Sequence, residues 1–180
     1  MTAHQAALEA LTRYFGYDSF RPGQQGIVEA LLAGRDVLGV MPTGAGKSVC
    51  YQIPAALSPG VTLVISPLIS LMRDQVDALN DLGLPAAFIN TTQTPDEQAM
   101  VFAQAAAGQI KLLYVAPERL ETGRFRDFAA RTPISLIAVD EAHCVSQWGQ
   151  DFRSSYLGIG DFIAGLPQRP PVGAFTATAT

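Results

Sequence analysis

The chain has 180 residues, of which 48% are hydrophobic and 16% charged, and its net charge is −4. This length and apolar content suit one domain with a sizeable core, while no apolar run is long enough to span a membrane. The acidic balance argues mildly against strong duplex-DNA binding by this chain alone, because domains that bind through counterion release are usually basic.

Apolar spacing predicts a helical N-terminal segment over residues 1–34. The residues that share a helical face are Leu8, Leu11 and Phe15 before Gly16, and then Ile27, Ala30 and Leu31 after Arg21-Pro-Gly23. Gly34 is the expected stop of the second helix.

Six short apolar runs then alternate with helical stretches. The predicted strands are Val37 to Met41, Val61 to Ile65, Ala86 to Ile89, Leu112 to Val115, Ile134 to Val139 and Val172 to Phe175. The clearest helical stretches are Val49 to Leu57 and the run that contains Leu68, Leu71, Met72, Val76 and Leu79. This alternation predicts a doubly wound α/β domain over 1–180, with a mostly parallel sheet covered by helices on both faces.

A glycine-rich turn joins the first strand to a helix. The turn reads Met41-Pro-Thr-Gly-Ala-Gly-Lys-Ser48, with Met41 where the strict phosphate-loop pattern has glycine. Glycines let backbone N–H groups face phosphates, and the start of the following helix adds partial positive charge. Lys47 is expected to neutralise the β and γ phosphates, and the Ser48 hydroxyl to hold Mg²⁺. The predicted phosphate-binding residues are Thr43, Gly44, Ala45, Gly46, Lys47 and Ser48.

Two adjacent carboxylates, Asp140 and Glu141, follow the strand that ends at Val139. Ligands of open α/β folds bind at the carboxyl ends of the strands. Asp140 is therefore a candidate magnesium ligand, and Glu141 a candidate to orient or deprotonate an attacking water. The alternative is a pair of solvated acids at a strand end. His143 is read equally as a polar loop residue or as a sensor near a γ-phosphate.

Groups that could stack on bases follow directly. They are Gln147, Trp148, Phe152 and Arg153, and the alternative for the two aromatic rings is a place in the core. Five basic residues between Lys111 and Arg131 indicate either a weak positive face or a solvated helix face. Only two cysteines occur, Cys50 and Cys144, outside any metal-ligand spacing, so buried thiols in a reducing compartment are expected and a zinc site is not.

Together these segments resemble the superfamily 2 helicases, and Asp140-Glu-Ala-His143 is similar to the acidic box of their DExH branch. The resemblance is most specific to the RecQ DNA helicases, and it extends from about Tyr14 to the last residue. The segments that carry it, besides the phosphate loop, are Phe15-Gly-Tyr17, Phe20-Arg-Pro-Gly-Gln24, Ser48-Val-Cys-Tyr-Gln-Ile-Pro54, Ser66-Pro-Leu-Ile-Ser-Leu-Met-Arg-Asp-Gln75, Tyr114-Val-Ala-Pro-Glu-Arg-Leu120 and Phe175-Thr-Ala-Thr-Ala179.

The resemblance implies a RecA-like motor lobe that uses ATP and Mg²⁺. Tyr17 could stack on a purine and Arg21 could pack beside it, while the Gln24 amide suits the N6 and N7 edge of adenine. Ordinary helix-start packing is the alternative for Tyr17 and Arg21.

The resemblance also implies that the aromatic-rich loop contacts single-stranded DNA and couples it to hydrolysis. Family members usually have histidine where this chain has Gln150, and often proline where it has Ser154. The first departure puts a hydrogen-bonding or proton-linked role in coupling in doubt, and the second loosens the loop at most.

The chain stops at Thr180, whereas RecQ helicases have a second motor lobe with an arginine finger and usually a zinc-binding and winged-helix region. We therefore expect one lobe of a longer 3′-to-5′ DNA helicase that acts on single-stranded and partially duplex DNA in repair and recombination. Its expected location is the bacterial cytoplasm, at the nucleoid. Alone, the lobe is expected to bind ATP weakly, hydrolyse little and unwind nothing. The alternatives are an RNA-directed DExH motor and a non-catalytic, nucleotide-dependent binding module.

Overall fold

A six-stranded sheet forms the centre of the protein. The computed structural model describes residues 1–42, 46–142 and 158–177. The strands are β1 (Val37–Val40), β2 (Val61–Ile65), β3 (Ala86–Ile89), β4 (Leu112–Val115), β5 (Ile134–Val139) and β6 (Val172–Thr176). They lie in the order β1-β6-β5-β2-β4-β3, and every neighbouring pair is parallel. All carboxyl ends therefore meet at one edge of the sheet.

The helices connect and cover these strands. They are α1 (Ala3–Ala10), the π-helical turn η1 (Leu11–Phe15), α2 (Gln24–Leu32), α3 (Val49–Leu57), α4 (Ile69–Asp81), α5 (Pro95–Ala106), the 3₁₀ turn η2 (Pro117–Glu121) and α6 (Gly123–Arg131). Residues 158–164 are also helical. Thr94 and Glu97 form a capping box at the start of α5, and the Thr122 hydroxyl caps α6.

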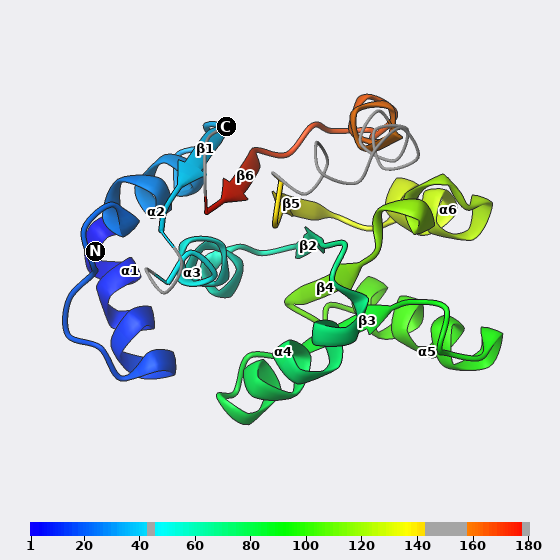
Figure 1. The fold of residues 1–180 in the computed structure, drawn as a ribbon, viewed down its shortest axis with the longest axis horizontal. Helices are drawn as coiled ribbons and strands as arrows, with labels where there is room; N and C mark the ends of the chain where they lie inside the picture. Colours follow the sequence, from blue (N-terminus) through cyan, green and yellow to red (C-terminus); the bar gives the residue numbers. More distant parts are fainter. Residues whose placement is uncertain (43–45, 143–157, 178–180) are drawn as a thin grey trace.

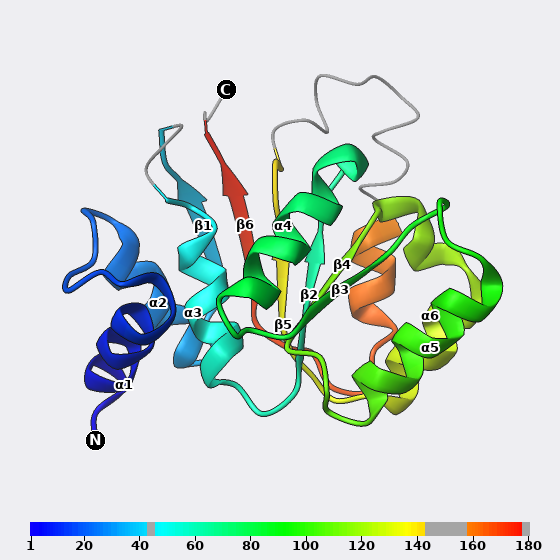
Figure 2. The ribbon, with the colours of Figure 1, turned by 90° about the horizontal axis from the view of Figure 1, so that it is seen from below.

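Two apolar cores lie on opposite faces of the sheet, as period-two alternation in buried strands requires. On β5, Leu136 and Ala138 belong to the core beneath α3 and α4. Ile137 and Val139 belong to the core beneath α5, α6 and the 158–164 helix. Figures 1 and 2 show these two helical layers, with α1 to α4 on one side and α5 and α6 on the other.

A third cluster joins the N-terminal helices to α3. Its fully buried members include Ala7, Val28 and Ile53, from α1, α2 and α3 respectively. The helices α1 and α2 thus pack against α3, the helix that follows the phosphate loop, and α2 also contacts β1, which places residues 17–24 near that loop.

The predicted α/β fold is confirmed, and all six predicted strands form within one residue of the expected bounds. The predicted helical stretch forms α4, in which Met72, Val76 and Leu79 are buried while Leu71 is 44% exposed. A buried stripe formed by positions 72, 76 and 79 leaves position 71 about 100° away on the helix. Within the described residues, none of the helices is long and apolar enough to cross a membrane.

Candidate nucleotide-binding site

The phosphate loop and the acidic pair meet across the carboxyl end of β6. The loop follows β1 and the acids follow β5, and β6 lies between these strands. The Met41 N–H donates to the Thr176 carbonyl at 3.0 Å, and the Ala142 N–H donates to the Phe175 carbonyl at 2.9 Å. Two consecutive carbonyls of one strand therefore hold both the start of the phosphate loop and the acidic turn.

Lys47 lies between the two acids. Its Nζ is 2.6 Å from Glu141 Oε1 and 3.7 Å from Asp140 Oδ1. The Lys47 side chain is only 18% exposed, and those of Glu141 and Asp140 are 20% and 5% exposed. The structure thus brings together the three residues that the sequence suggests as catalytic, with one ammonium facing two carboxylates.

Asp140 is a buried carboxylate. Burial raises its pKa above the ordinary 3.8, and the positive charge of Lys47 opposes that rise. The Asp140 N–H donates to the Ile65 carbonyl at 2.9 Å, which fixes the backbone against β2. Its Oδ1 accepts the Glu141 N–H at 2.9 Å. These two hydrogen bonds hold Asp140 at the end of β5, with its carboxylate on the side of Lys47.

Glu141 has an uncommon backbone conformation. Its φ is +54°, in the left-handed region, and no other non-glycine residue among those described has a positive φ. This conformation costs a non-glycine residue roughly 1–2 kcal/mol. The turn at Glu141 directs its carboxylate to Lys47 instead of continuing the strand. A strained residue at a ligand-binding edge is a typical feature of functional sites.

Gln24 connects the N-terminal segment to the phosphate loop. Its Nε2 donates to the Gly46 carbonyl at 2.9 Å, and its Oε1 accepts the Arg21 N–H at 2.8 Å. The side chain is only 3% exposed. Gly46 has a φ of +74°, and a Cβ there would lie 2.6 Å from Gln24 Nε2. The backbone therefore favours glycine at position 46, and a Cβ there would also push the Gln24 amide away from its present position.

Tyr17 and Arg21 pair at the surface beside this glutamine. The Arg21 guanidinium carbon lies 6.0 Å from the centre of the Tyr17 ring, within cation–π range. Tyr17 is half exposed, so its ring remains partly accessible to a ligand. The three residues suggested for adenine thus lie together next to the phosphate loop.

Two buried tyrosines beneath the site have no role in the sequence interpretation. Tyr51 on α3 and Tyr114 on β4 are fully buried, and the Gln52 amide donates to the Tyr114 hydroxyl at 3.4 Å. Burial raises the Tyr51 pKa far above its usual range, and the charge of Asp140 adds to the rise. The Tyr51 ring also packs on Phe175 with centroids 5.4 Å apart. Tyr51 follows Ser48 by three positions, which would have placed both on one helical face from sequence.

Several suggested residues lie outside the described ranges. They are Thr43, Gly44 and Ala45 of the phosphate loop, and His143, Gln147, Trp148, Gln150, Phe152 and Arg153 of the aromatic-rich loop. Ser48 is described and forms the N-cap of α3. In the described part of the chain there is no group of three or more His, Cys, Asp or Glu suited to a metal. The suggested magnesium site needs only the Asp140 carboxylate and the Ser48 hydroxyl from the protein.

A parallel α/β sheet with a lysine-bearing phosphate loop opposite an acidic pair defines a RecA-like P-loop NTPase domain. Residues 21–180 match the family model described as DEAD/DEAH box helicase. The chain belongs to the DEAD/DEAH box helicase family.

Several relatives from different bacteria are named ATP-dependent DNA helicase RecQ. The chain is 51% identical over 173 residues to ATP-dependent DNA helicase RecQ of Haemophilus influenzae, covering 96% of this chain and 28% of that protein. It is 47% identical over 175 residues to the protein of the same name in Bacillus subtilis, covering 97% of this chain and 30% of the relative. The resemblance to RecQ helicases is therefore confirmed. The chain spans less than a third of the length of these relatives.

Solved structures of low sequence identity share the fold. A hypothetical ATP-dependent RNA helicase from Sulfolobus tokodaii superposes with a TM-score of 0.73 at 20% identity, over 97% of this chain and 50% of that one. The DUF1998 helicase MrfA, bound to DNA and AMPPNP, gives a TM-score of 0.78 at 18% identity, over 100% of this chain and 27% of that one. At such identities the likeness supports the fold alone.

Proposed function

We propose that this chain is the ATP-binding motor lobe of an ATP-dependent DNA helicase that moves 3′-to-5′ on single-stranded DNA in repair and recombination. The observation that carries the proposal is the meeting of Lys47 with Asp140 and Glu141 at the carboxyl edge of the sheet. The DNA substrate is supported by relatives named DNA helicase RecQ. The resemblance to that group supports the proposed polarity and pathway, and bacterial relatives support a cytoplasmic location at the nucleoid.

The residues present fit ATP and Mg²⁺. Carboxylate and hydroxyl oxygens are the ligands that Mg²⁺ takes in phosphate-binding sites, and Asp140 and Ser48 would supply them. A carboxylate that is buried and compensated only in part by Lys47 is suited to a second cation. When bound, Mg²⁺ would neutralise phosphate charge. Lys47 would then bind the β and γ phosphates as a point charge.

The ligand-free ion pair has a direct consequence for catalysis. Glu141 is the candidate base, yet its carboxylate is held by Lys47 at 2.6 Å. Lys47 must leave Glu141 in order to reach phosphates. That exchange frees Glu141 to orient a water and accept its proton, so the base becomes available only when Lys47 has another anion.

Adenine recognition would draw on Tyr17, Arg21 and Gln24. The partly exposed ring of Tyr17 would stack on the base, and the Gln24 amide would pair with its N6 and N7 edge. Gln24 already bonds to Gly46 and Arg21, so base recognition would redistribute those contacts. The glutamine therefore links occupation of the base pocket to the phosphate loop.

The remaining parts of the proposed motor lie outside the described residues or outside this chain. The aromatic-rich loop would contact single-stranded DNA through Trp148, Phe152 and Arg153, and Gln147 and His143 would relay that contact to the nucleotide. A second lobe of the same parent protein would supply an arginine to the transition state, worth 10³–10⁵ in rate for GTPases. Gln150 would modify this coupling relative to relatives with histidine.

The proposal is tested with the full-length natural protein. ATP hydrolysis is measured alone, with single-stranded DNA and with RNA of the same sequence, and Lys47→Ala and Glu141→Gln serve as inactive controls. We expect stimulation by DNA that both variants lose. Preferential stimulation by RNA would support the RNA-directed motor. Hydrolysis equal in wild type and Lys47→Ala would support a non-catalytic binding module.

A second measurement tests the contribution of this lobe alone. Residues 1–180 are assayed for binding of a fluorescent ATP analogue and for unwinding of a duplex with a 3′ single-stranded tail. We expect weak binding, which Lys47→Ala abolishes, and no unwinding. Robust unwinding by residues 1–180 would contradict the assignment of a two-lobe motor.

A further inference from the structure

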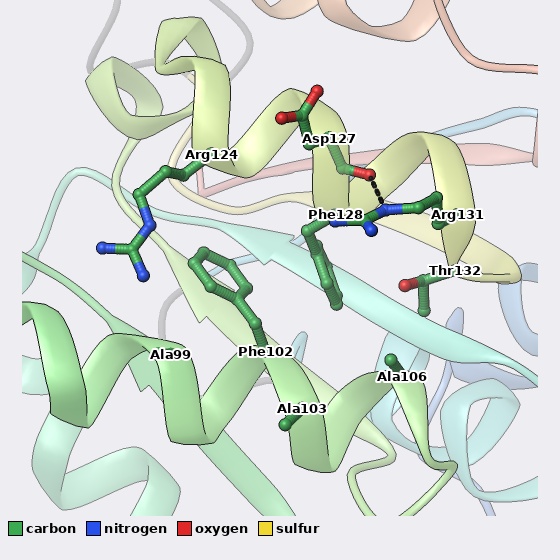
Figure 3. A pocket seen from close by; sticks show the side chains of 9 residues that line it. All are labelled: Ala99, Phe102, Ala103, Ala106, Arg124, Asp127, Phe128, Arg131 and Thr132. Carbon is green, nitrogen blue, oxygen red and sulfur yellow. Dashed lines mark hydrogen bonds between the residues drawn. The ribbon is translucent and has the colours of Figure 1, made fainter.

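A groove runs between α5 and α6 on the flank of the sheet, away from the nucleotide site. Its larger part has a volume of about 490 Å³, and Figure 3 shows the side chains that line it. A second hollow of about 370 Å³ shares Phe102 and Arg124 with the first. On α5 the lining residues follow helical spacing and are mostly small, namely Ala99, Phe102, Ala103 and Ala106. The alanines leave the space between the helices unfilled.

The groove begins at the carboxyl edge of the sheet, next to β3 and β4, whereas the nucleotide site lies at the same edge next to β1 and β5. The second hollow is lined by Gln93 and Pro95, which follow β3, and by Arg119 and Thr122, which follow β4. Both helices start at the carboxyl edge of the sheet and run towards its opposite edge, as Figure 2 shows. The 12 residues of α5 span about 18 Å. The groove is thus continuous with the edge where the proposed motor would hold DNA.

Positive charge is concentrated along this groove, in a chain whose net charge is −4. Arg119, Arg124 and Arg131 line it, against a single acid, Asp127. Figure 3 shows the Arg124 guanidinium extended over the groove towards α5, whereas the Asp127 carboxylate points to the side of α6 away from α5. Among the described residues neither Arg124 nor Arg119 has a carboxylate partner within 4 Å.

Two buried side-chain atoms that line the groove can donate hydrogen bonds and lack a partner among the described residues, whereas Arg131 Nε already donates to the Asp127 carbonyl. Arg119 Nε and Thr132 Oγ1 are buried, and neither has a hydrogen-bond partner among the described residues. Thr132 as a whole is only 8% exposed. A buried donor without an acceptor is unfavourable, so a ligand that brings acceptor oxygens would satisfy both atoms. The floor is aromatic, since the Phe102 and Phe128 rings lie 4.9 Å apart.

We propose that the α5–α6 groove binds the backbone of single-stranded DNA that continues from the carboxyl edge of the sheet. Phosphates offer only acceptors and negative charge, which match the three arginines and the buried donors. A length of about 18 Å corresponds to about five nucleotides at the 3.4 Å spacing of B-DNA, and to fewer in an extended strand. The site rests on the proposed DNA-helicase function and extends its DNA path beyond the nucleotide edge.

Two groove variants, each with a control variant outside the groove, test this site in the full-length protein. Arg124→Gln combined with Arg131→Gln removes two charges from the groove, while Arg126→Gln removes one from an exposed position of α6 that does not line it. Ala99→Glu places a carboxylate in the groove beside Arg124. Met100→Glu makes the same charge change at the next position of α5, which is 63% exposed and outside the groove.

Binding of fluorescent oligothymidylate is measured by anisotropy between about 50 and 200 mM salt, a range in which phosphate contacts dominate the salt dependence. Each contact with single-stranded DNA contributes a slope of about 0.7 in log K against log salt. Loss of two contacts in the double arginine variant should lower the slope by about 1.4. If this variant and the wild type bind equally at 1 M salt, the variant should bind roughly 25-fold more weakly than the wild type at 0.1 M salt. Ala99→Glu should weaken binding, whereas Arg126→Gln and Met100→Glu should each change it less than twofold.

The experiment distinguishes an error in the groove proposal from an error in the proposed helicase function. If the wild-type protein hydrolyses ATP in response to single-stranded DNA while groove and control variants bind DNA equally, the groove is not part of the DNA path. If wild type shows neither DNA binding nor DNA-stimulated hydrolysis, the helicase proposal itself fails. If the groove variants bound polyglutamate more weakly than wild type but bound oligothymidylate equally well, the groove would be a site for an acidic ligand of another class. DNA-independent hydrolysis is expected to be equal in all variants, because none of these residues lies in the nucleotide site.

Discussion

Replacement of Lys47 by methionine should destabilise the ligand-free protein because it leaves two carboxylates without their shared cation. Lys47→Met keeps most of the aliphatic side chain and removes only the ammonium. That ammonium lies 2.6 Å from Glu141 and 3.7 Å from Asp140. Asp140 is 4% exposed, so its charge has little water to replace the lost partner.

The magnitude follows from the two distances. At an effective dielectric constant of about 20, the gross attractions are about 6 kcal/mol to Glu141 and about 4 kcal/mol to Asp140. Dehydration and ordering of the lysine offset much of this, and removal of one partner from a fully buried pair costs about 3–5 kcal/mol. Because Lys47 and Glu141 are both about one-fifth exposed, we expect a loss of about 2–3 kcal/mol of unfolding free energy.

A double-mutant cycle assigns the loss to the buried acid. Urea unfolding is followed by circular dichroism for wild type, Lys47→Met, Asp140→Asn and the double variant. Burial raises the pKa of Asp140, so its ionised form is unfavourable in the folded state, and Asp140→Asn alone should be neutral or slightly stabilising at pH 7. The double variant should recover at least about 1 kcal/mol of the loss caused by Lys47→Met.

The same cycle has a defined pH dependence. The pKa of Asp140 is higher in the folded protein than its ordinary 3.8, so its contribution favours folding below that value and is lost as pH rises through the folded pKa. The stability gap between Lys47→Met and the double variant should therefore shrink as pH falls from 7 towards 3.8. Equal stability of these two proteins at pH 7, with no change in the gap on acidification, would refute the ion-pair reasoning.

Three further predictions concern single positions. Gln24→Ala removes the contacts to Gly46 and Arg21, and should lower the unfolding free energy by about 1–2 kcal/mol. It should also weaken binding of a fluorescent ATP analogue, and unchanged affinity would show that Gln24 does not contribute to nucleotide binding. Gly46→Ala should lose more stability in urea unfolding than Gly83→Ala, since both have positive φ but only position 46 would bring a Cβ within 2.6 Å of another side chain; equal losses would contradict the close approach. Burial raises the Cys50 pKa to about 12, so iodoacetamide at pH 8 should modify this thiol only after unfolding in urea, as read by peptide mass spectrometry; rapid modification of the folded protein would show that the thiol is accessible.

The sequence predicted the architecture well because buried parallel strands have a simple pattern. Runs such as Leu112 to Val115 are apolar at every position, as burial on both faces requires, and the phosphate loop has a fixed place between a strand and a helix. The helices over the second face were less evident. Thr94 followed by Pro95 and Glu97 is a capping-box pattern that would have marked the start of α5.

The contacts inside the site could not be predicted from the sequence, because they depend on how distant segments pack. Gln24 and Gly46 are 22 positions apart, and their bond depends on how α2 packs against α3. The left-handed backbone of Glu141 likewise depends on the turn that follows β5, since glutamate has no preference for it. Residue types at the site were thus predictable, whereas the pairing of Lys47 with Glu141 in the ligand-free state required coordinates.

The position of β6 between β1 and β5 also determines when this site can exist during synthesis of the chain. The backbone bond from Met41 to Thr176 and the bond from the Val172 N–H to the Asp36 carboxylate join the last strand of the chain to the first. The second of these bonds connects residues that are 136 positions apart. Closing such long loops is slow, because the chain loses conformational entropy before the contacts between the two strands stabilise it. A ribosome-bound chain that has exposed only its phosphate loop therefore lacks the backbone support that β6 gives to the start of this loop. Nucleotide affinity should arise as a late step of folding, after residue 176 has emerged, and not gradually as the chain lengthens.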